Sequence, residues 1–534
     1  MSKPTFDLGA SAYAEMIKDG FHPDFLAGTD AQVASIRAAA DARAESNELP
    51  DAKVHDLRGL WWSSIDNDTS RDLDQVEWAE RVQADATGGG ADSNSNSASQ
   101  GGGIRVRVGV ANVAAAVGKG SPIDRHAADQ TKTVYTATRN FPMLPNQLST
   151  DLTSLNQDED RAAVVTEYVV DAQGQLSGQS IYRALVHNRA QLAYSRVGPW
   201  LEGKCGDHPG CLDTKIAGSV ELQEQLRLQD EAAQAMRAHR VAQGALEFHR
   251  IEADPLVVDG QVKAIHEAPH NRATELIEDF MIGANETMAE TLRAAGRSCI
   301  RRVVRVPQRW DRIVELAGRY GTKLPAEAES KALNDFLSAQ RAKDPVHYPD
   351  LSLAIIKLMG PGEYVVIEGN DPEPLGHFGL AARDYAHSTA PNRRFADLVT
   401  QRLIVAMLDG VEAPYTDEEL RAIALQCNLR EHASHKVERT MVKRVAAVAL
   451  ADKIGMRFPR SGYRGEREGN ICAGLRPSGG GPGDQRREGA GCGGPGGCEA
   501  AAYEPADGFH RFCAGLRRRL ERFTATGTDY VALV

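Results

Sequence analysis

Hydrophobic and polar positions recur with two different periods along this chain. Apolar and polar residues alternate over 104–110, which predicts a β-strand. The segments 162–171 and 178–186 also read as strands, paired around a tight turn. Helical spacing predicts long amphipathic helices over 222–244 and 274–295. The strands therefore lie in the first part of the chain, and helices dominate after it.

Shorter helices are predicted on both sides of these segments. The Ala-rich stretch 7–45 predicts two helices, at 10–17 and 31–44, with Asp30 as a possible N-cap of the second. A helical pattern also covers 125–136. The further elements predicted downstream are helices at 315–319, 330–339, 352–359, 394–408 and 417–450 and a strand at 364–369.

Length and composition bound the domain organisation. A chain of 534 residues is too long for one ordinary core, so two to four domains are expected. Its 42% hydrophobic and 25% charged residues are typical of a soluble globular protein. The Gly/Ser/Asn-rich stretch 87–103 predicts a flexible loop between two strands. We predict a small helical, helix-turn-helix-like N-terminal domain at 1–55, a main domain at 56–400, its C-terminal helices at 401–458 and a Gly/Arg-rich tail at 459–534.

The tail at 459–534 differs in character from the rest of the chain. It is rich in Gly, Arg, Cys and Pro and has no periodicity. Cys492 and Cys498 could be metal ligands, but an out-of-frame reading of GC-rich coding sequence gives the same bias. We therefore favour a frameshifted or naturally disordered tail. Resequencing of the coding DNA tests this, and an intact frame with no hidden alternative would exclude the frameshift.

Charge and cysteine usage narrow the choice of compartment and partners. A net charge of −11 argues against unspecific binding to polyanions, although a basic channel can still lie in an acidic protein. No run of 18 apolar residues and no apolar signal core is present, so we expect no membrane span and a cytoplasmic location. We expect no disulfide framework. Cys205, His208 and Cys211 provide only three ligands, so we do not expect zinc there.

One acidic stretch, 65–75, carries the strongest chemical signal. It follows a mostly apolar run and precedes another apolar segment, so we expect a strand, a tight loop and a second strand. Asp66, Asp68, Asp72 and Asp74 would repel one another, and a hard cation such as Mg²⁺ removes that cost. On an extended strand Asp72 and Asp74 share a face. The alternative is a solvated acidic turn.

Several segments, read in chain order, resemble one family. The acidic stretch looks like the metal-binding signature of the ribonuclease II/ribonuclease R (RNB) exoribonucleases, and the resemblance covers roughly residues 20–455. A chance match to all the segments in the right order is improbable. The segments that carry the resemblance are 66–75, 110–113, 120–124, 142–149, 152–156, 188–201, 377–381, 385–395 and the pair Glu438-Arg439.

The resemblance implies an α+β RNB catalytic domain, in which helices wrap a mixed or antiparallel sheet around an RNA channel. It implies processive, Mg²⁺-dependent hydrolysis of single-stranded RNA from the 3′ end, with release of nucleoside 5′-monophosphates and a short limit oligonucleotide. One or two Mg²⁺ ions would be held by Asp66, Asp72, Asp74 and Gln75. Gln75 departs from the family pattern, which has a fourth Asp there, so one ion could bind more weakly.

The resemblance also assigns roles to five other side chains. Arg393 would place a fixed positive charge on the scissile phosphate, and Arg394 would help to bind RNA. Glu438 would orient Arg393 or a base at the 3′ end. Tyr135 would clamp the 3′-terminal base, with Tyr194 as a second aromatic of the same kind. The alternatives are surface ion pairs for the arginines, a solvated glutamate and core tyrosines.

Two further features stay open to more than one interpretation. Arg301, Arg302 and Arg305, with Arg309 and Arg312 following, form a basic cluster that is either a solvated face or a contact for RNA phosphates. We expect His387 to be structural.

Two rival functions are weighed against the nuclease. Gln75 and Asn112 motivate a catalytically weakened RNA-binding relative, and an unrelated metal phosphodiesterase acting on small substrates is the other rival. The family's cold-shock-type and C-terminal OB domains are not recognisable, so we expect weaker capture of RNA. No stable protein partner is expected.

Overall fold

The computed structural model describes residues 7–46, 49, 51–82, 102–205, 213–248, 253–258, 261–267, 270–369, 371 and 375–450. The predicted loop at 87–103 lies almost entirely outside these described residues, and the predicted tail at 459–534 lies wholly outside them. The boundaries proposed for the four domains stay predictions.

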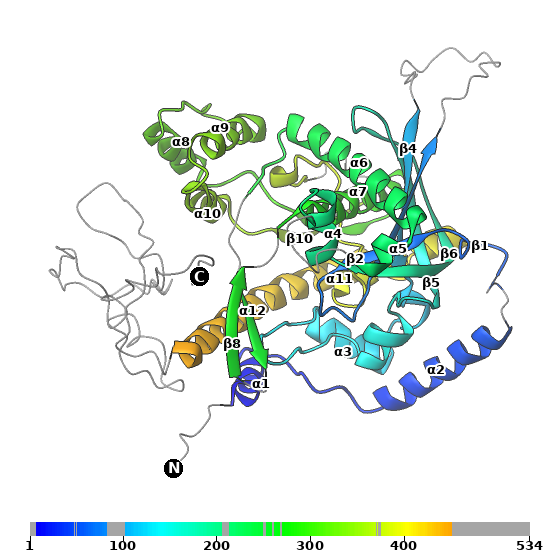
Figure 1. The fold of residues 1–534 in the computed structure, drawn as a ribbon. Helices are drawn as coiled ribbons and strands as arrows, with labels where there is room; N and C mark the ends of the chain where they lie inside the picture. The colour runs from blue at the N-terminus through cyan, green and yellow to red at the C-terminus, as the bar shows by residue number, and fades with distance from the viewer. Residues whose placement is uncertain are drawn as a thin grey trace.

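A six-stranded mixed sheet forms the centre of the molecule, with the strand order β1-β6-β2-β3-β4-β5. The long strand β6 pairs with β5 and β1 along its first part and with β2 along its last part, so the sheet curls until its ends meet (Figure 1). The pairs β1–β6 and β2–β6 are parallel and the others antiparallel. The strands are β1 (Val54–Asp56), β2 (Trp62–Asp66), β3 (Gln75–Val82), β4 (Gly103–Ala111), β5 (Asp160–Val170) and β6 (Leu176–Ala193).

The predicted alternation in β4 reflects its two environments. Val106 and Val108 are fully buried in the main core. Arg107 points to the other face, where it pairs with Glu167 at 2.6 Å and lies over the ring of Trp78. An apolar face toward a core and a polar face toward solvent give the period of two.

Helices cover the sheet and extend beyond it (Figure 1). The helices α6 and α7 pack against each other and against the sheet, where Met236, Phe280 and Tyr168 are buried together in the main core. This arrangement confirms the expected α+β class, with helices wrapped around a mixed sheet. The helices are α1 (Leu8–Lys18), α2 (Thr29–Ser46), α3 (Pro122–Gln130), α4 (Tyr194–Leu201), α5 (Thr214–Gly218), α6 (Val220–Ala242), α7 (Arg272–Ala294), α8 (Trp310–Arg319), α9 (Ser330–Lys343), α10 (Tyr348–Met359), α11 (Phe395–Asp409) and α12 (Asp417–Leu450), with 3₁₀ turns η1 (Val113–Ala115) and η4 (Phe378–Leu380) and a π-helical turn η2 (Leu148–Leu152).

Two smaller cores flank the main one. The helices α8, α9 and α10 pack around Ile313, Leu333 and Ile355. In the sequence they lie between β9 (Cys299–Val303) and β10 (Glu363–Ile367), which pair with each other as a small antiparallel sheet. The first helix, α1, packs against the long helix α12 through a third cluster that includes Met16 and Met441. The N-terminal helix α1 therefore packs directly against the domain that contains the central sheet.

The structure corrects several local predictions. The segment between α6 and α7 contains a hairpin, β7 (Ala253–Val258) and β8 (Gln261–Glu267), which we did not predict because helices were expected to dominate this part of the chain. The helix predicted over 125–136 ends at Gln130, because Thr131 adopts the left-handed conformation at φ 57°. Asp30 lies inside the first turn of α2 and does not precede the helix.

Two arginines of the basic cluster, Arg301 and Arg302, belong to neither of the two classes considered, whereas Arg305 is half exposed. Arg301 is 1% exposed and pairs with Asp384 at 2.8 Å. Arg302 is mostly buried and forms two hydrogen bonds to Glu431. Burial of an arginine requires such a partner, so these two side chains hold the small sheet in place and are not a solvated face.

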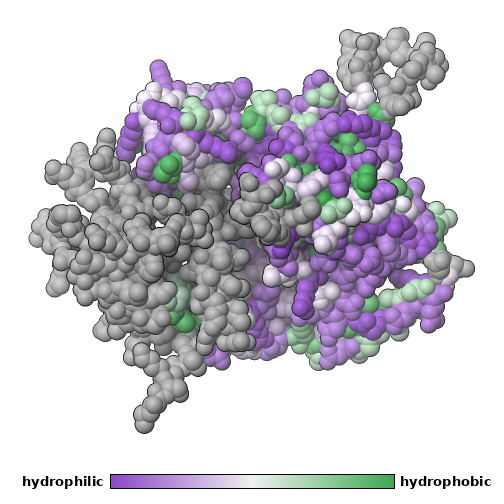
Figure 2. All heavy atoms as spheres, viewed as in Figure 1, coloured by the Kyte–Doolittle hydropathy of each residue, from purple (hydrophilic) through white to green (hydrophobic). Residues whose placement is uncertain are grey.

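The face of the molecule shown in Figure 2 is predominantly hydrophilic, with scattered apolar residues. Among the described helices, none is both long enough and apolar enough to cross a membrane.

Candidate active site

The acidic loop connects β2 to β3, as the sequence predicted. Asp66 ends β2, and its Oδ1 accepts hydrogen bonds from the backbone N–H of Asn67 at 2.7 Å and from the hydroxyl of Ser70 at 3.0 Å. Burial raises the pKa of Asp66, although the positive charge of Arg393 opposes the shift. The loop thus begins at a carboxylate that is already held in place.

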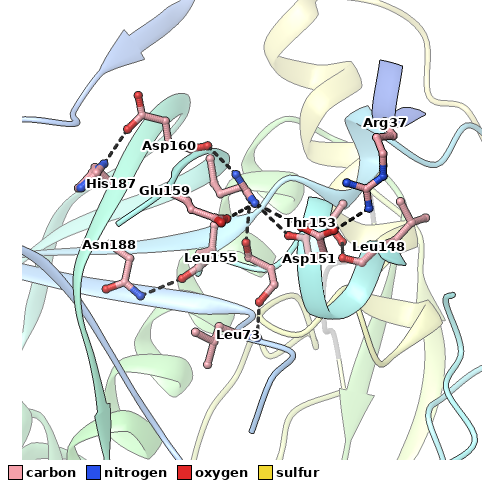
Figure 3. A network of polar contacts seen from close by, with 12 residues as sticks. Arg37, Leu73, Leu148, Asp151, Thr153, Leu155, Glu159, Asp160, His187 and Asn188 are labelled. Carbon is pink, nitrogen blue, oxygen red and sulfur yellow. Dashed lines mark hydrogen bonds and ion pairs between the residues drawn. The ribbon is translucent and has the colours of Figure 1, made fainter. Parts of the chain in front are cut away.

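The backbone of Leu73, between Asp72 and Asp74, is held from both sides (Figure 3). Its N–H donates to the hydroxyl of Ser154 at 3.0 Å, and its carbonyl accepts from the N–H of Leu155 at 2.9 Å. The 153–155 segment therefore fixes the backbone from which the side chains of Asp72 and Asp74 extend.

Asp74 lies at the centre of the site and is 1% exposed. Its Oδ1 accepts from the backbone N–H of Asn392 at 3.1 Å, and its Oδ2 lies 3.1 Å from Nε of Arg393. Burial raises the pKa of Asp74 to about 7, and Arg393 moderates the shift. The structure therefore brings two predicted residues, Asp74 and Arg393, together.

The segment before α11 presents the arginines. Asn392 exchanges two hydrogen bonds with Thr153, so the segment that fixes Leu73 also fixes the approach to Arg393. Arg393 keeps 37% of its side chain exposed and is open to a ligand. Burial disfavours its charge, but the surrounding acidic groups, Asp74 foremost, raise its pKa. Arg394 pairs with the buried Asp397 at 2.7 Å, so it supports the turn and is less free to bind RNA.

The two predicted tyrosines lie beside the loop. The hydroxyl of Tyr135 donates to Oδ2 of Asp72 at 2.7 Å, while the residue stays 40% exposed. Tyr194 begins α4 directly after β6. Burial raises the pKa of Tyr194, and the charges of Asp66 and Glu77 add to the effect. Both rings are therefore close to candidate metal ligands.

One prediction about the site needs correction. Strand β3 begins at Gln75, so Asp72 and Asp74 precede it and do not share a strand face: Asp72 meets Tyr135 and Asp74 meets Arg393. Within the described part of the chain, Glu438 pairs with Lys132 at 3.4 Å, and its role in orienting Arg393 or a base stays a prediction. The cause is the position of Glu438 on α12, beside the strand-like segment that carries Lys132.

The donor chemistry of the loop fits a hard cation, since Asp66, Asp72 and Asp74 provide carboxylate oxygens. Each of these aspartates accepts its hydrogen bonds through one carboxylate oxygen. The buried Oδ2 of Asp74 forms an ion pair with Arg393 but has no hydrogen-bond partner. In the region the structure describes, no three His, Cys, Asp or Glu side chains are arranged to hold a metal. The carboxylates fit in kind and would have to turn toward the ion. Gln75 is buried at the start of β3 and adds no charge.

Sequence reasoning missed the residues that hold the site together. Thr153, Ser154 and Asn392 connect the acidic loop to the arginine turn, although they lie far apart in the sequence. All three lie within segments that carry the family resemblance, which was the signal that could have identified them.

Cys205 is disulfide-bonded in the structure, which leaves no thiolate for zinc at that position.

Comparisons with known proteins identify relatives of this chain. Ribonuclease R of Aquifex aeolicus is 29% identical over 384 residues, which are 68% of this chain and 52% of that protein. Ribonuclease R of Escherichia coli is 26% identical over 441 residues, 80% of this chain and 50% of that protein. The chain therefore spans about half the length of the curated relatives it matches.

Comparison with solved structures finds proteins with a similar fold. Mycoplasma genitalium RNase R, solved in complex with ribose-methylated single-stranded RNA, has a TM-score of 0.69 to this chain at 24% identity, covering 85% of this chain and 66% of that one. A profile of the RNB domain matches residues 54–410, which are more than half of the chain. The chain therefore belongs to the RNB family.

Proposed function

We propose that this chain is a hydrolytic 3′-to-5′ exoribonuclease that degrades single-stranded RNA to nucleoside 5′-monophosphates and leaves a short limit oligonucleotide. The observation that carries the proposal is the pairing of the buried Asp74, in the acidic loop, with the partly exposed Arg393, in the segment before α11. Family membership supports it, because the matched relatives are named ribonuclease R. A cytoplasmic location is part of the proposal, since the substrate is cellular RNA.

Arg393 is the residue proposed to contact the scissile phosphate. A guanidinium stays charged at all working pH values and offers two parallel donors to phosphate oxygens. The exposed part of Arg393 can bind the phosphate while Nε stays beside Asp74. Charge that develops on the phosphate in the transition state would then meet a donor that is already in position.

Asp66, Asp72 and Asp74 are the residues proposed to hold one or two Mg²⁺ ions, with Gln75 as an uncharged fourth donor. When bound, Mg²⁺ activates the attacking water and neutralises the leaving 3′-oxygen. The chain's own contribution is to keep the carboxylates in place: Ser70 and the Asn67 N–H hold Asp66. The Asn392 N–H holds Asp74.

Tyr135 and Tyr194 are proposed to bind the 3′-terminal nucleotide. An aromatic ring stacks on any base, so it suits an enzyme that removes nucleotides without regard to sequence. Tyr135 is exposed enough to accept a base while its hydroxyl reaches Asp72, which places the base next to the acidic site. The RNA bound to the Mycoplasma genitalium enzyme supports single-stranded RNA as the ligand.

A catalytically weakened RNA-binding relative is the second candidate, because Gln75 lacks the charge of an aspartate. Asn112, the other motive for it, has a structural role here: its Oδ1 caps η1 by accepting from the N–H of Ala115 at 3.2 Å. Chromatography of the products from uniformly labelled RNA separates the candidates. The enzyme releases nucleoside 5′-monophosphates from polymers and leaves a short oligonucleotide, whereas the weakened relative binds the RNA and releases no monophosphates.

A further inference from the structure

The segment that carries Tyr135 is a short hairpin. Val134 and Phe141 pair in antiparallel fashion through two backbone hydrogen bonds of 3.0 and 2.9 Å. The tip between them is closed by Thr136, whose hydroxyl donates to the carbonyl of Arg139 at 2.6 Å and accepts from its N–H at 3.2 Å. Tyr135 is the first residue of this tip, so the position of its ring depends on where the hairpin lies.

The N-terminal helix shares a core with the base of this hairpin. Val134 and Phe141 are 0% and 1% exposed and belong to the same apolar cluster as Met16 of α1 and Phe21, which follows that helix. Residues of α12 complete the cluster. An isolated two-stranded hairpin is marginally stable in water, so this short one needs such packing against other elements.

A second contact joins α1 to the tip of the hairpin. The guanidinium of Arg139 lies 5.4 Å from the centroid of the Tyr13 ring and 5.1 Å from that of Phe141. The hydroxyl of Tyr13 donates to Asp24 in the segment after the helix, which holds the ring in place. A cation over an aromatic ring is a favourable contact even near the surface. Arg139 therefore connects α1 to the tip that carries Tyr135.

Ion pairs fix α1 on the long helix α12. Glu15, which is 3% exposed, pairs with Arg444 at 2.6 Å. Asp19 directly follows α1 and pairs with Lys436. Separation of a buried carboxylate from its partner is costly, so these pairs resist displacement of the helix. A fixed position is what a residue that supports a binding site requires.

We propose that α1 is part of the nucleotide-binding site and that Tyr13 and Met16 are positioning residues for Tyr135. The inference rests on the proposed function, in which Tyr135 stacks on the 3′-terminal base. Tyr13 and Met16 act without touching RNA, by keeping the hairpin where the Tyr135 hydroxyl meets Asp72. In this role the N-terminal helix serves the nuclease site itself and is not an independent nucleic-acid-binding module.

A 2-aminopurine at the 3′ end of the RNA tests the proposal, because stacking on an aromatic ring quenches the fluorescence of this base. A short single-stranded RNA of this kind is titrated with the full chain in EDTA, for wild type, Met16→Ala, Tyr13→Ala and Tyr135→Ala. Met16→Leu and Tyr13→Phe are conservative controls that keep the apolar contact and the ring, respectively. Leu333→Ala is the matched core control, because Leu333 is 0% exposed in the separate core of α8–α10.

We expect Met16→Ala and Tyr13→Ala to lose most of the quenching and to weaken RNA binding at least about fivefold, the lower end of the value of one stacked base. Met16→Leu, Tyr13→Phe and Leu333→Ala should stay close to wild type. Combined with Tyr135→Ala, the α1 variants should cause no further loss, since they act through the same ring. Thermal unfolding verifies that each variant is folded, and Tyr13 is only partly buried, so Tyr13→Ala tests the proposal even if Met16→Ala does not fold.

Two results would overturn the inference, and they differ in what they say of the proposed function. If Tyr135→Ala loses the quenching and the α1 variants keep it, α1 is merely structural and the proposed stacking on Tyr135 stands. If Tyr135→Ala quenches as strongly as wild type, the stacking role proposed for Tyr135 is wrong and the inference fails with it.

Discussion

Nε of Arg393 lies 3.1 Å from Oδ2 of Asp74, across two segments that are far apart in the sequence. Asp74 is almost completely buried, whereas Arg393 keeps 37% of its side chain exposed. The pair thus has one partner anchored in the core and one that is open to a ligand. This asymmetry is what a phosphate-binding arginine requires, because its position is fixed before the substrate arrives.

Replacement of Arg393 should impair the reaction more than binding. We expect Arg393→Gln to lower kcat on single-stranded RNA about 10²- to 10³-fold, since it removes a donor aimed at the transition state. Steady-state kinetics measure this. Arg319→Gln is the control, because Arg319 is an exposed arginine that pairs with Glu315 on α8. Unchanged kcat in Arg393→Gln would mean that the arginine only neutralises Asp74.

The ring and the hydroxyl of Tyr135 should have separable effects. Tyr135→Phe loses the hydrogen bond to Asp72 but keeps the ring, so RNA affinity should stay close to that of wild type. Tyr135→Ala should lose about 1–3 kcal/mol of binding, the usual value of one base stacked on an aromatic ring. Gel-shift titrations with single-stranded RNA, without divalent metal, compare the two. Equal losses in both variants would contradict a base-stacking role.

Glu438 pairs with Lys132 across 3.4 Å, and both side chains are partly exposed. A double-mutant cycle with Lys132→Gln and Glu438→Gln should therefore give a coupling energy of at most about 1 kcal/mol in unfolding experiments. If Glu438 also contacts RNA, Glu438→Gln will weaken RNA binding equally in the presence and absence of Lys132. If its only role is the ion pair, the effect of Glu438→Gln on RNA binding will vanish in the Lys132→Gln background.

Stability should depend on pH through Glu286, a residue of α7 remote from the acidic loop. Burial raises the pKa of Glu286 to about 7, with Arg240 opposing the shift. A raised carboxyl pKa means that the folded state binds a proton more tightly than the unfolded state, so stability is lost as the pH rises from about 4 to about 7. Glu286→Gln removes this loss.

The free energy of unfolding of Glu286→Gln should therefore exceed that of wild type by an amount that grows with pH, up to about 3 kcal/mol at pH 8. Urea denaturation of both proteins at pH 5 and pH 8, without metal, measures the difference. An offset that is the same at the two pH values would show that Glu286 does not carry an unfavourable charge in the folded protein.

Local sequence patterns predicted most elements but few of the contacts between them. The periodicity of 162–186 gave the β5–β6 pair, and the spacing of 274–295 gave α7, because each pattern reflects one buried face. The hairpin β7–β8 was missed, since the long helical pattern around it dominated the interpretation.

The candidate site shows the same limit. The family resemblance named Asp74 and Arg393, but their partners depend on tertiary contacts: the N–H of Asn392 donates to Asp74, and the side chain of Asn392 is hydrogen-bonded to Thr153. Arg301 illustrates the opposite error, because a run of arginines that resembles a surface cluster contains a buried ion pair. Sequence alone does not distinguish a charge that faces solvent from one with a buried partner.

Degradation of a 5′-labelled single-stranded RNA tests the central claim most directly. The RNA is incubated with Mg²⁺ and either wild type or Asp74→Asn, and with wild type plus EDTA. The account predicts a ladder that shortens from the 3′ end to a stub of a few nucleotides with wild type alone. Intact RNA that wild type still shifts on a gel would contradict it, and would mean that the fold is kept for RNA binding without hydrolysis.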